Sequence, residues 1–321
     1  MKRYLLILLC AVCLLAGCTG KPQSQTKELF AMDTVMHLTV YSQEDGVLKQ
    51  GEEEIRRLET LFSVTDENSD IARLNQSKGQ WVTVSDETAR LLTLANEYAK
   101  QTEGRFDPTV YPAVMAWGFT TDQKRVPSQE ELDGLLELVD YNQIEIKGTQ
   151  VRLPKEMGVD LGAIAKGYAA DRVKALYEAA GVSGILSLGG NVLTIGHKPD
   201  GTPFSVAIQD PQNAAATLGV LTLKGGQAAV TSGDYQRYFE QNGVRYHHIL
   251  DPKIAAPAKS DLTSVTVITD SAAMADAYAT ALFVAGKEQA LSLAKALNVQ
   301  AVLVTKDGQI HCTDDVQFTP S

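Results

Sequence analysis

The chain has 321 residues, of which 44% are hydrophobic and 21% charged, and its formal net charge at pH 7 is −10. This composition is typical of a folded globular protein that is long enough to bury a substantial core, and it argues against disorder. The negative balance and the absence of any Lys/Arg-rich run exclude an extended nucleic-acid surface, although they leave a local basic pocket open.

The first residues predict an exported protein with a lipid anchor. Lys2 and Arg3 precede an apolar run that is too short to span a bilayer, and Leu15-Ala16-Gly17-Cys18 closes it. This pattern resembles a bacterial lipobox, which implies a signal peptide over 1–17 and lipidation of Cys18. An ordinary secretory signal cut elsewhere is the weaker alternative, because the small-small-Cys ending falls where the apolar run stops. The mature protein is expected on the extracytoplasmic side of the cytoplasmic membrane, held by acyl chains.

After cleavage, residues 18–27 are polar and predict a flexible tether between the membrane and the domain. Cys312 is the one cysteine outside the signal and the lipidation site, so neither a disulfide framework nor a thiolate metal site is expected. No repeat, low-complexity tract or linker divides 28–318. These residues predict one catalytic-size domain rather than two.

The predicted elements alternate between short strands, often in hairpins, and amphipathic helices. The strands are expected over 28–42, 81–84, 144–146, 151–153, 184–192 with a glycine turn, 204–208, 218–223, 229–235, 238–250 with a turn at 242–243, 262–269, 301–305 and up to 312. The helices are expected over 47–62, 85–104, 128–138, 160–181, 272–284 and 288–297. This order predicts an α+β fold, a single mixed domain of antiparallel strands and hairpins with flanking helices.

The stretch 159–171 carries an acid and a base at the start of a helix. Asp160 is placed to cap a helix that ends before Gly181, and the small residues at 162, 163 and 165 leave room for a close approach. A helix start of this kind attracts anions through its free N–H groups. The alternative is a capped core helix with tight packing and no ligand.

Two further segments offer polar groups whose purpose stays open at this point. The run 104–112 has two prolines and holds Arg105 and Asp107, which is typical either of a turn with an ion pair or of a stiff loop that presents groups to a ligand. His247 and His248 are adjacent on a predicted strand, so their side chains point to opposite faces and at most one faces a given site. Either histidine can equally be structural.

Asp276 lies in the middle of an alanine-rich helix, with Thr280 one turn later on the same face. No lysine or arginine lies three or four residues from Asp276 on its own helix. If this face is buried, the carboxylate needs an external cation or hydrogen-bond donors, because unpaired burial costs several kcal/mol. Carboxylate, hydroxyl and main-chain oxygens suit Mg²⁺. The alternative is a solvent-facing Asp/Thr pair.

Familiar catalytic signatures are absent from the sequence. It contains no G-x-S-x-G elbow, H-E-x-x-H pair, G-x-x-x-x-G-K-[ST] loop or G-x-G-x-x-G fingerprint. Their absence disfavours α/β-hydrolases, zinc proteases, P-loop enzymes and Rossmann dehydrogenases, but it leaves phosphate chemistry on another scaffold open.

Seven separated motifs resemble, in their order, those of the ApbE family, the FAD:protein FMN transferases. They are Met32-Asp33-Thr34, Gly104-Arg105-Phe106-Asp107, Asp160-Leu161-Gly162-Ala163-Ile164-Ala165-Lys166-Gly167-Tyr168, Leu188-Gly189-Gly190-Asn191, Ser232-Gly233-Asp234-Tyr235, His247-His248-Ile249-Leu250-Asp251-Pro252 and Ala275-Asp276-Ala277-Tyr278-Ala279-Thr280-Ala281. The resemblance covers nearly all of the mature domain. It implies an ApbE-like, T-fold-like architecture, with FAD as donor, Mg²⁺ at its pyrophosphate, transfer of FMN to a Thr or Ser hydroxyl of an acceptor protein, and release of AMP.

The resemblance also assigns roles to individual residues of this chain. It implies metal ligands at Asp276, Thr280 and the main-chain oxygen of Ala163, with Asp276 and His248 in the chemistry. It implies FAD contacts at Met32, Thr65, Phe106, Asp107, Asp160, Lys166 and His247. Two departures stand out: Asp33 replaces the glycine usual in the family, and Ile254-Ala255 replaces the usual Thr-Gly.

The chain lacks the acceptor pattern of Ser/Thr-Gly-Ala-Ser/Thr, so it is expected to modify a partner, either a subunit of a membrane redox complex or an exported flavoprotein. Two alternatives remain. One is a metal-dependent FAD pyrophosphatase that yields FMN and AMP, and the other is a lipoprotein that binds FAD without catalysis.

Overall fold

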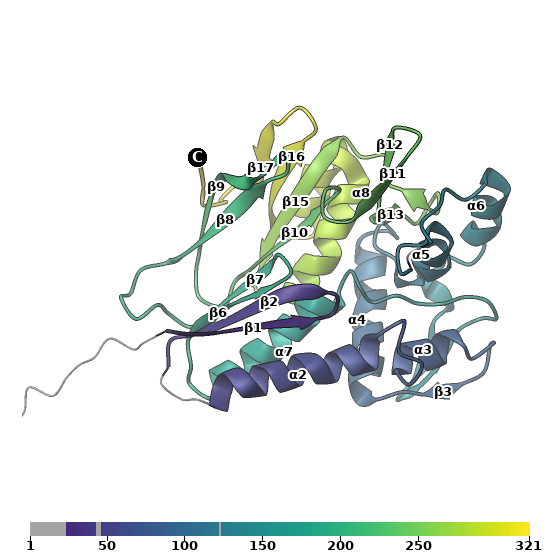
Figure 1. Cartoon of the computed structure of the whole chain (residues 1–321), viewed down its shortest axis with the longest axis horizontal. Helices are drawn as coiled ribbons and strands as arrows, with labels where there is room; N and C mark the ends of the chain where they lie inside the picture. Colours follow the sequence, from purple (N-terminus) through teal and green to yellow (C-terminus); the bar gives the residue numbers. More distant parts are fainter. Residues whose placement is uncertain (1–23, 43–45, 122) are drawn as a thin grey trace, which may run out of the picture.

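The computed structural model describes residues 24–42, 46–121 and 123–321, and its largest element is an eight-stranded antiparallel sheet (Figure 1). The strand order is β1-β2-β6-β7-β10-β15-β16-β17. The bounds are β1 Gln25–Ala31, β2 Thr34–Val40, β6 Gly184–Leu188, β7 Asn191–Ile195, β10 Ala228–Gly233, β15 Leu262–Thr269, β16 Gln300–Thr305 and β17 Ile310–Cys312. The turns β1–β2 and β6–β7 and the end of β10 therefore meet at one end of the sheet.

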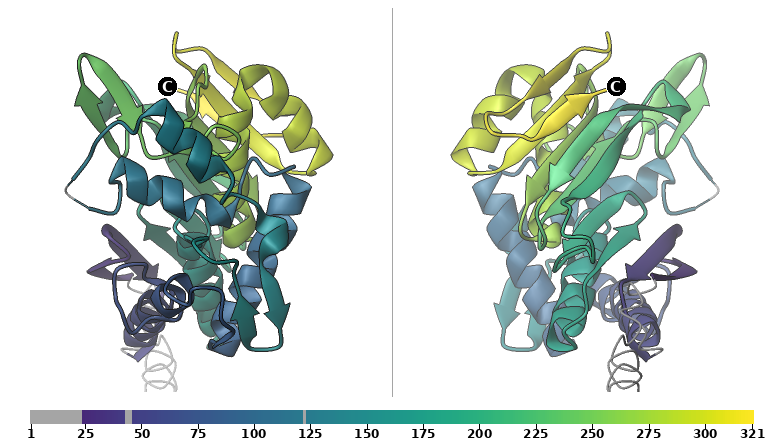
Figure 2. Two further views of the ribbon diagram at one scale, coloured as in Figure 1. Left: turned by 90° about the vertical axis from the view of Figure 1, so that its right-hand side faces the viewer. Right: turned by 90° about the vertical axis from the view of Figure 1, so that its left-hand side faces the viewer.

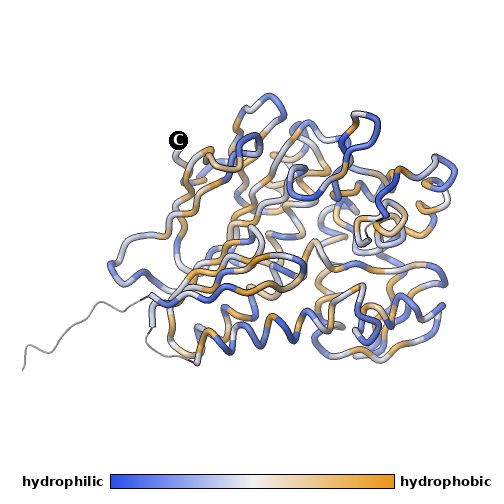
Figure 3. The backbone as a smooth tube through the Cα atoms, viewed as in Figure 1, coloured by the Kyte–Doolittle hydropathy of each residue, from blue (hydrophilic) through white to orange (hydrophobic). Residues whose placement is uncertain are grey.

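Three helices cover one face of this sheet: α2 (Gly46–Phe62), α7 (Ala165–Ala179) and α8 (Ala272–Ala296). Helix α8 packs on β10 and β15, α7 lies between α8 and α2, and the apolar faces of all three form the main core. Hydrophobic and hydrophilic residues alternate along α2, as expected of a helix with one buried face (Figure 3). Gly286 has a left-handed φ of 71° and divides α8 into two helical segments, as the sequence predicted.

The opposite face of the sheet is covered by three strands, β8 (Phe204–Asp210), β9 (Asn213–Leu223) and β18 (Phe318–Pro320), which form their own sheet (Figures 1 and 2). Alternate residues of β8 are buried, and Phe204 and Ile208 pack with Ile268 and Val302 of the main sheet. The main sheet is thus buried on both faces around β10, β15 and β16, whereas one face of β1 and β2 stays exposed.

The remaining elements lie beside the helical layer, at the end of the sheet where the turns meet (Figure 1). They are α3 Asp70–Asn75, β3 Val82–Thr83, α4 Asp86–Gln101, η1 Pro108–Val110, α5 Tyr111–Trp117, α6 Gln129–Leu136, η2 Tyr141–Gln143, β4 Glu145–Lys147, β5 Gln150–Arg152, β11 Tyr238–Gln241, β12 Val244–His247, β13 Leu250–Asp251 and β14 Ala256–Pro257. Trp117 packs against Phe119, Phe239 and Tyr246, so α5 and the β11–β12 hairpin share a small separate core.

The structure confirms the α+β class and most of the predicted helices and hairpins, with three differences. Strand β1 begins at Gln25 and pairs with Val40, so the last residues of the predicted tether belong to the sheet, and β18 extends the folded domain to Pro320. The predicted two-proline loop is helical, because Pro108 and Pro112 stand in the first turns of η1 and α5, where a missing N–H costs nothing. No helix of the described ranges is long and apolar enough to cross a membrane. The predicted signal peptide and Cys18 lie outside the described residues.

The third difference concerns Asp160, which does not cap the long helix. Helix α7 starts at Ala165 after Ile164, without a side-chain cap. Ile164 and Ala165 both donate to the carbonyl of Leu161, so a separate turn intervenes and Asp160 falls too early in the chain. The predicted N-cap was therefore wrong, although the predicted end before Gly181 is confirmed by its φ of 67°.

Candidate functional site

The site is organised by the crossing of α7 and α8 at Gly167. A Cβ at this position would lie 2.1 Å from the carbonyl oxygen of Ala272, so only glycine permits the two backbones to approach so closely. At this distance the main-chain N–H of Gly167 donates to Oδ2 of Asp276 across 3.0 Å. The crossing thus joins two motifs that are separated by more than a hundred residues.

Asp276 is buried, with 4% of its surface exposed, and it has two partners from α7. Besides the Gly167 N–H, the Lys166 ammonium lies 3.8 Å from Oδ2 of Asp276 and donates to the carbonyl of Gly162 across 2.9 Å. The sequence predicted that a buried Asp276 carboxylate would need a hydrogen-bond donor or a cation from outside its own helix. Helix α7 supplies both. The solvent-facing alternative is excluded by the burial.

The oxygen atoms of Asp276, Thr280 and Ser232 form a row in which each lies close to the next. Thr280 Oγ1 lies 3.4 Å from the carbonyl of Asp276 and 3.3 Å from the Ser232 hydroxyl at the end of β10. Gly167 is the third residue of α7, so its N–H has no acceptor within the helix, and the Asp276 carboxylate supplies one. Among the described residues, no backbone N–H donates to the Ala163 carbonyl, so this oxygen can accept a cation.

The predicted Mg²⁺ ligands Asp276, Thr280 and Ala163 offer one carboxylate, one hydroxyl and one main-chain oxygen. Across 24–42, 46–121 and 123–321, no group of three His, Cys, Asp or Glu side chains could hold a metal ion. A cation at Asp276 would therefore depend on neutral oxygens for its other protein ligands, which suits a hard divalent ion that keeps water or phosphate ligands.

Asp160 lies in the turn that precedes α7. Its Oδ1 accepts from the N–H of Gly162 across 2.8 Å, and its own N–H donates to the carbonyl of Pro108 across 2.8 Å. The protein atoms crowded around it raise the pKa of the Asp160 carboxyl, while the Gly162 N–H and the positive charges of Lys166 and Arg237 act in the opposite direction. Asp160 therefore connects the turn before α7 to the loop that holds Phe106 and Asp107.

The predicted contacts Phe106 and Asp107 are buried in that loop. Asp107 Oδ1 accepts from the N–H and the hydroxyl of Thr109, and Oδ2 accepts from the N–H of Tyr141. Burial raises the pKa of Asp107, against these hydrogen bonds. The carboxylate of Asp107 therefore shapes its own loop. Thr65 is exposed, and its hydroxyl lies 3.2 Å from that of Ser63, so no bond joins it to the row of oxygen atoms.

The two histidines lie on opposite sides of the strand end, as predicted. His247 is buried, its Nε2 lies 3.2 Å from the carbonyl of Ala258, and its ring packs edge-on against Phe283; burial lowers its pKa to about 4. His248 is half-buried, and its Nδ1 lies 3.1 Å from the carbonyl of Arg237. Burial lowers the pKa of His248 to about 3, and the charges of Arg237 and Lys166 add to the decrease. His248 thus faces the cations of the site.

The turn at Met32 completes this side of the site. Met32 is half-buried against the core, and its N–H donates to Glu59 Oε1 across 2.5 Å. Its neighbour Asp33 is exposed and pairs with Arg237 at 2.7 Å. Ser232 and Arg237 had no role in the sequence prediction, although Ser232 belongs to the segment Ser232-Gly233-Asp234-Tyr235 that resembles a family motif. Their importance depends on contacts between elements, which no local pattern reports.

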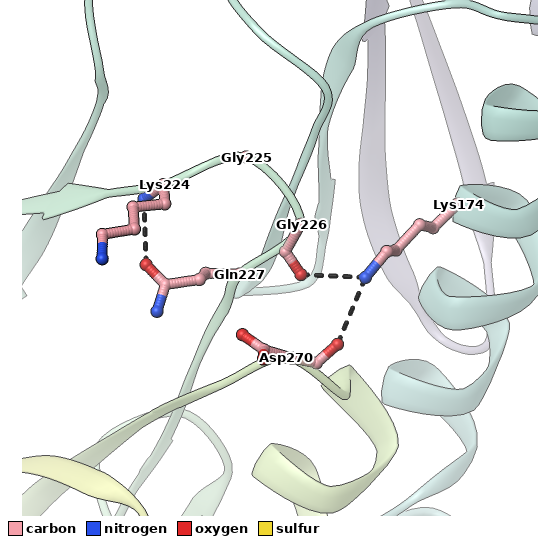
Figure 4. A pocket seen from close by; sticks show the side chains of 6 residues that line it. All are labelled: Lys174, Lys224, Gly225, Gly226, Gln227 and Asp270. Carbon is pink, nitrogen blue, oxygen red and sulfur yellow. Dashed lines mark hydrogen bonds between the residues drawn. The ribbon is translucent and has the colours of Figure 1, made fainter.

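A pocket elsewhere on the surface does not belong to this site. Figure 4 shows it between the β9–β10 turn and the start of α8, lined by Lys174, Lys224, Gly225, Gly226, Gln227 and Asp270. The Lys174 ammonium donates to the carbonyls of Gly226 and Asp270, which ties the turn to the end of β15. Lys174 therefore stabilises the packing of these segments.

The solved structures most relevant to this architecture are flavin transferases. The chain superposes on the ApbE protein of Thermotoga maritima with a TM-score of 0.87 at 35% identity, over 91% of this chain and 97% of the other. It superposes on the apo flavinyl transferase ApbE of Pseudomonas stutzeri with a TM-score of 0.82 at 30% identity, over 91% and 95%. Fold and site together define a transferase of this architecture.

The sequence comparisons identify the family. The model described as the ApbE family matches residues 32–303. The FAD:protein FMN transferase of Vibrio cholerae is 33% identical over 318 residues, 95% of this chain and 94% of the relative. The protein of the same name from Escherichia coli K12 is 36% identical over 259 residues, 77% and 73% of the two chains. The chain belongs to the ApbE family.

Proposed function

We propose that this enzyme transfers FMN from FAD to a Thr or Ser hydroxyl of an acceptor protein, releases AMP and depends on Mg²⁺. The observation that supports the proposal is the buried carboxylate of Asp276, which accepts from the Gly167 N–H, lies 3.8 Å from the Lys166 ammonium and has Thr280 one turn later on its own helix. The names of the relatives support the donor and the transfer. The Thr or Ser hydroxyl and the release of AMP are what the resemblance to the ApbE family implies, and they are consistent with FAD, whose diphosphate can break between its two phosphorus atoms.

The residues that would hold Mg²⁺ are Asp276, Thr280 and Ala163, through its main-chain oxygen. When bound, the ion supplies positive charge that neutralises the diphosphate and the departing phosphate. Lys166 adds a second positive charge beside the same carboxylate, where it favours an anionic substrate over water. Met32, Phe106, Asp107, Asp160 and His247 remain proposed donor contacts or supports of that pocket, and Thr65 remains a proposed contact from a neighbouring loop.

His248 is the proposed general base. Its lowered pKa keeps the ring neutral at pH 7, and an Nδ1–H that donates to the Arg237 carbonyl leaves the lone pair on Nε2. This nitrogen takes the proton as the acceptor oxygen bonds to the FMN phosphorus. The bond from that phosphorus to the bridging oxygen breaks, and AMP leaves with the electron pair.

The proposed setting follows from the N-terminal pattern. Lipidated Cys18 would hold the enzyme on the extracytoplasmic side of the bacterial cytoplasmic membrane, within reach of membrane redox complexes and exported flavoproteins. Acceptors are proposed to carry a Ser/Thr-Gly-Ala-Ser/Thr segment. No nucleic acid is expected as a partner, since the chain is acidic.

One incubation tests the proposal against its alternatives. The purified protein is mixed with FAD, Mg²⁺ and an acceptor domain that carries the proposed segment, and the acceptor is analysed by mass spectrometry. An acceptor that gains the mass of FMN, together with AMP in solution, is the expected result. AMP with free FMN would instead identify a pyrophosphatase, and unchanged FAD would identify a binding protein. Transfer that persists after complete removal of metal by EDTA would refute the role of Mg²⁺.

A further inference from the structure

The turn between β1 and β2 has an unfavourable residue at its second position. Met32 and Asp33 form a two-residue turn with φ values of 48° and 59°, both in the left-handed region. Such a turn favours glycine at the second position, because a side chain there raises the energy of the backbone by about 1 kcal/mol. Asp33 therefore occupies a strained position, and both its side chain and its main-chain carbonyl contact Arg237.

Asp33 is held by Arg237 through two acceptors. One guanidinium nitrogen of Arg237 lies 2.7 Å from Oδ2 of Asp33 and donates to the main-chain oxygen of Asp33 across 2.9 Å. The bridge spans 204 residues of sequence. It joins the β1–β2 turn to the segment between β10 and β11.

The β6–β7 turn lies next to both segments that this bridge connects. A Cβ on Gly189 would lie 2.6 Å from the Thr34 side chain, and one on Gly190 would lie 3.7 Å from the Gln236 amide. The glycine turn is therefore in contact with both segments that Asp33 and Arg237 connect. The three segments therefore lie side by side at this end of the sheet.

Arg237 also controls the ring of His248. Its carbonyl oxygen accepts from the main-chain N–H of His248 across 3.0 Å and lies 3.1 Å from Nδ1 of the same residue. A carbonyl can only accept, so Nδ1 carries the proton and Nε2 keeps the lone pair. The main-chain position of Arg237 thus decides which nitrogen of His248 can act as a base.

We propose that Asp33 is a positioning residue, which acts through Arg237 to hold His248 in the tautomer and orientation that the transfer reaction uses. The inference rests on the proposed role of His248. The side chain of Arg237 is anchored at the β1–β2 turn, and its carbonyl is anchored at His248, so a displacement of one end moves the other. Asp33 and Arg237 expose 77% and 48% of their side chains, and an exposed pair contributes little to stability. Its effect is on geometry.

The direct test is the tautomer of His248. Long-range ¹H–¹⁵N correlation spectra of the histidine-labelled full domain at pH 7 report which ring nitrogen is protonated, and His248→Gln assigns the signal. We expect the Nδ1–H form in the native chain and a mixture of tautomers in Asp33→Asn. Asparagine suits the left-handed turn, so this change removes the charge while it keeps the fold. An unchanged, single tautomer in Asp33→Asn would overturn the proposal, and this readout needs no transfer activity.

Kinetics supply the second test. With FAD, Mg²⁺ and an acceptor domain, Asp33→Asn is expected to lower kcat about tenfold while the Kd for FAD stays within about twofold, because a misplaced base slows only the chemical step. Asp33→Asn in an Arg237→Gln background is expected to have no further effect, since both changes break one connection. Equal losses in FAD binding and kcat, or additive losses in the double variant, would overturn the proposal.

A matched control lies on the β11–β12 hairpin, which connects Arg237 to His248. Glu240 pairs with Arg245 at 3.4 Å, also at the surface, but joins only neighbouring strands. Glu240→Gln is expected to leave both kcat and the His248 tautomer unchanged. If native protein transfers no FMN, the proposed function fails, whereas the tautomer measurement still decides the role of Asp33.

Discussion

The main-chain N–H of Gly167 donates to the carboxylate of Asp276 across 3.0 Å, and this bond joins the start of α7 to the middle of the first segment of α8. It satisfies a buried acid, and it gives a partner to the Gly167 N–H, which has no acceptor within α7. One hydrogen bond thus holds one of the three proposed metal ligands, Asp276, against the start of α7.

The close helix crossing predicts a severe effect of Gly167→Ala. The new Cβ would meet the backbone of Ala272 and Ala273 at 2.1 and 2.8 Å, and backbone cannot rotate away as a side chain does. We expect a loss of about 3 kcal/mol in the free energy of unfolding, measured in urea. Gly134→Ala is the control: a Cβ there meets nothing within 4 Å, and we expect a gain of about 0.5–1 kcal/mol. A stable Gly167→Ala with intact Mg²⁺ dependence would contradict this account of the site.

Asp276→Asn tests the proposed metal ligand. The amide keeps the size of the side chain but loses the charge, so the Mg²⁺ concentration for half-maximal transfer is expected to rise at least about tenfold. FAD binding measured without metal should change far less. Asp133→Asn on the exposed face of α6 is the control for a lost carboxylate. Native turnover and native Mg²⁺ dependence in Asp276→Asn would remove this residue from the ligand set.

Asp160→Ser separates a structural role from a role in binding the donor. Because Asp160 does not cap α7, the change removes one hydrogen bond to Gly162, and we expect a stability loss of only about 1 kcal/mol. The affinity for FAD, followed by flavin fluorescence, should decrease by more than the change that about 1 kcal/mol would cause. A large loss of helix α7 with unchanged FAD affinity would show that the carboxylate is structural.

The stability of the domain should decrease in mild acid. The pKa of His247 is about 4 in the folded protein, against an ordinary value of 6.5, because the ring is buried. Between these values the unfolded chain binds the proton and the folded chain does not, so stability is present above pH 6.5 and is lost as the pH decreases toward 4. His247 alone should contribute about 2 kcal/mol of this loss at pH 5. Urea unfolding at pH 7.5 and 5 measures it, and His247→Gln should reduce the difference; an unaltered difference would contradict the assignment.

Cys18→Ser tests the proposed anchor. Without a thiol to acylate, the protein should move from the membrane fraction to the soluble extracytoplasmic fraction, and labelled palmitate should no longer be incorporated. Cys312→Ser, at the surface of β17, is the control and should leave the fractionation unchanged. Membrane retention of Cys18→Ser would show that another feature holds the enzyme there.

Part of the site could be predicted from sequence because its signals are local. Asp276 was recognised from the absence of a nearby base on its own helix, but the sequence left a buried and a solvent-facing carboxylate equally open, and its exposure of 4% decides for burial. The cap assigned to Asp160 was wrong. An aspartate that precedes an amphipathic pattern gives the same signal whether the helix starts directly after it or, as here, at Ala165. The turn at Leu161–Ile164 depends on how the chain enters the packed layer.

The sequence by itself determined the family, the hairpins and helices, and the residue types able to bind a diphosphate and a cation. Each is encoded in short-range periodicity or in the order of motifs. Only the tertiary structure decided that Gly167 and Lys166 serve Asp276, and that Asp33 reaches His248 through Arg237. These partners are matched by the angle and distance at which separate elements cross. No stretch of one element records that geometry.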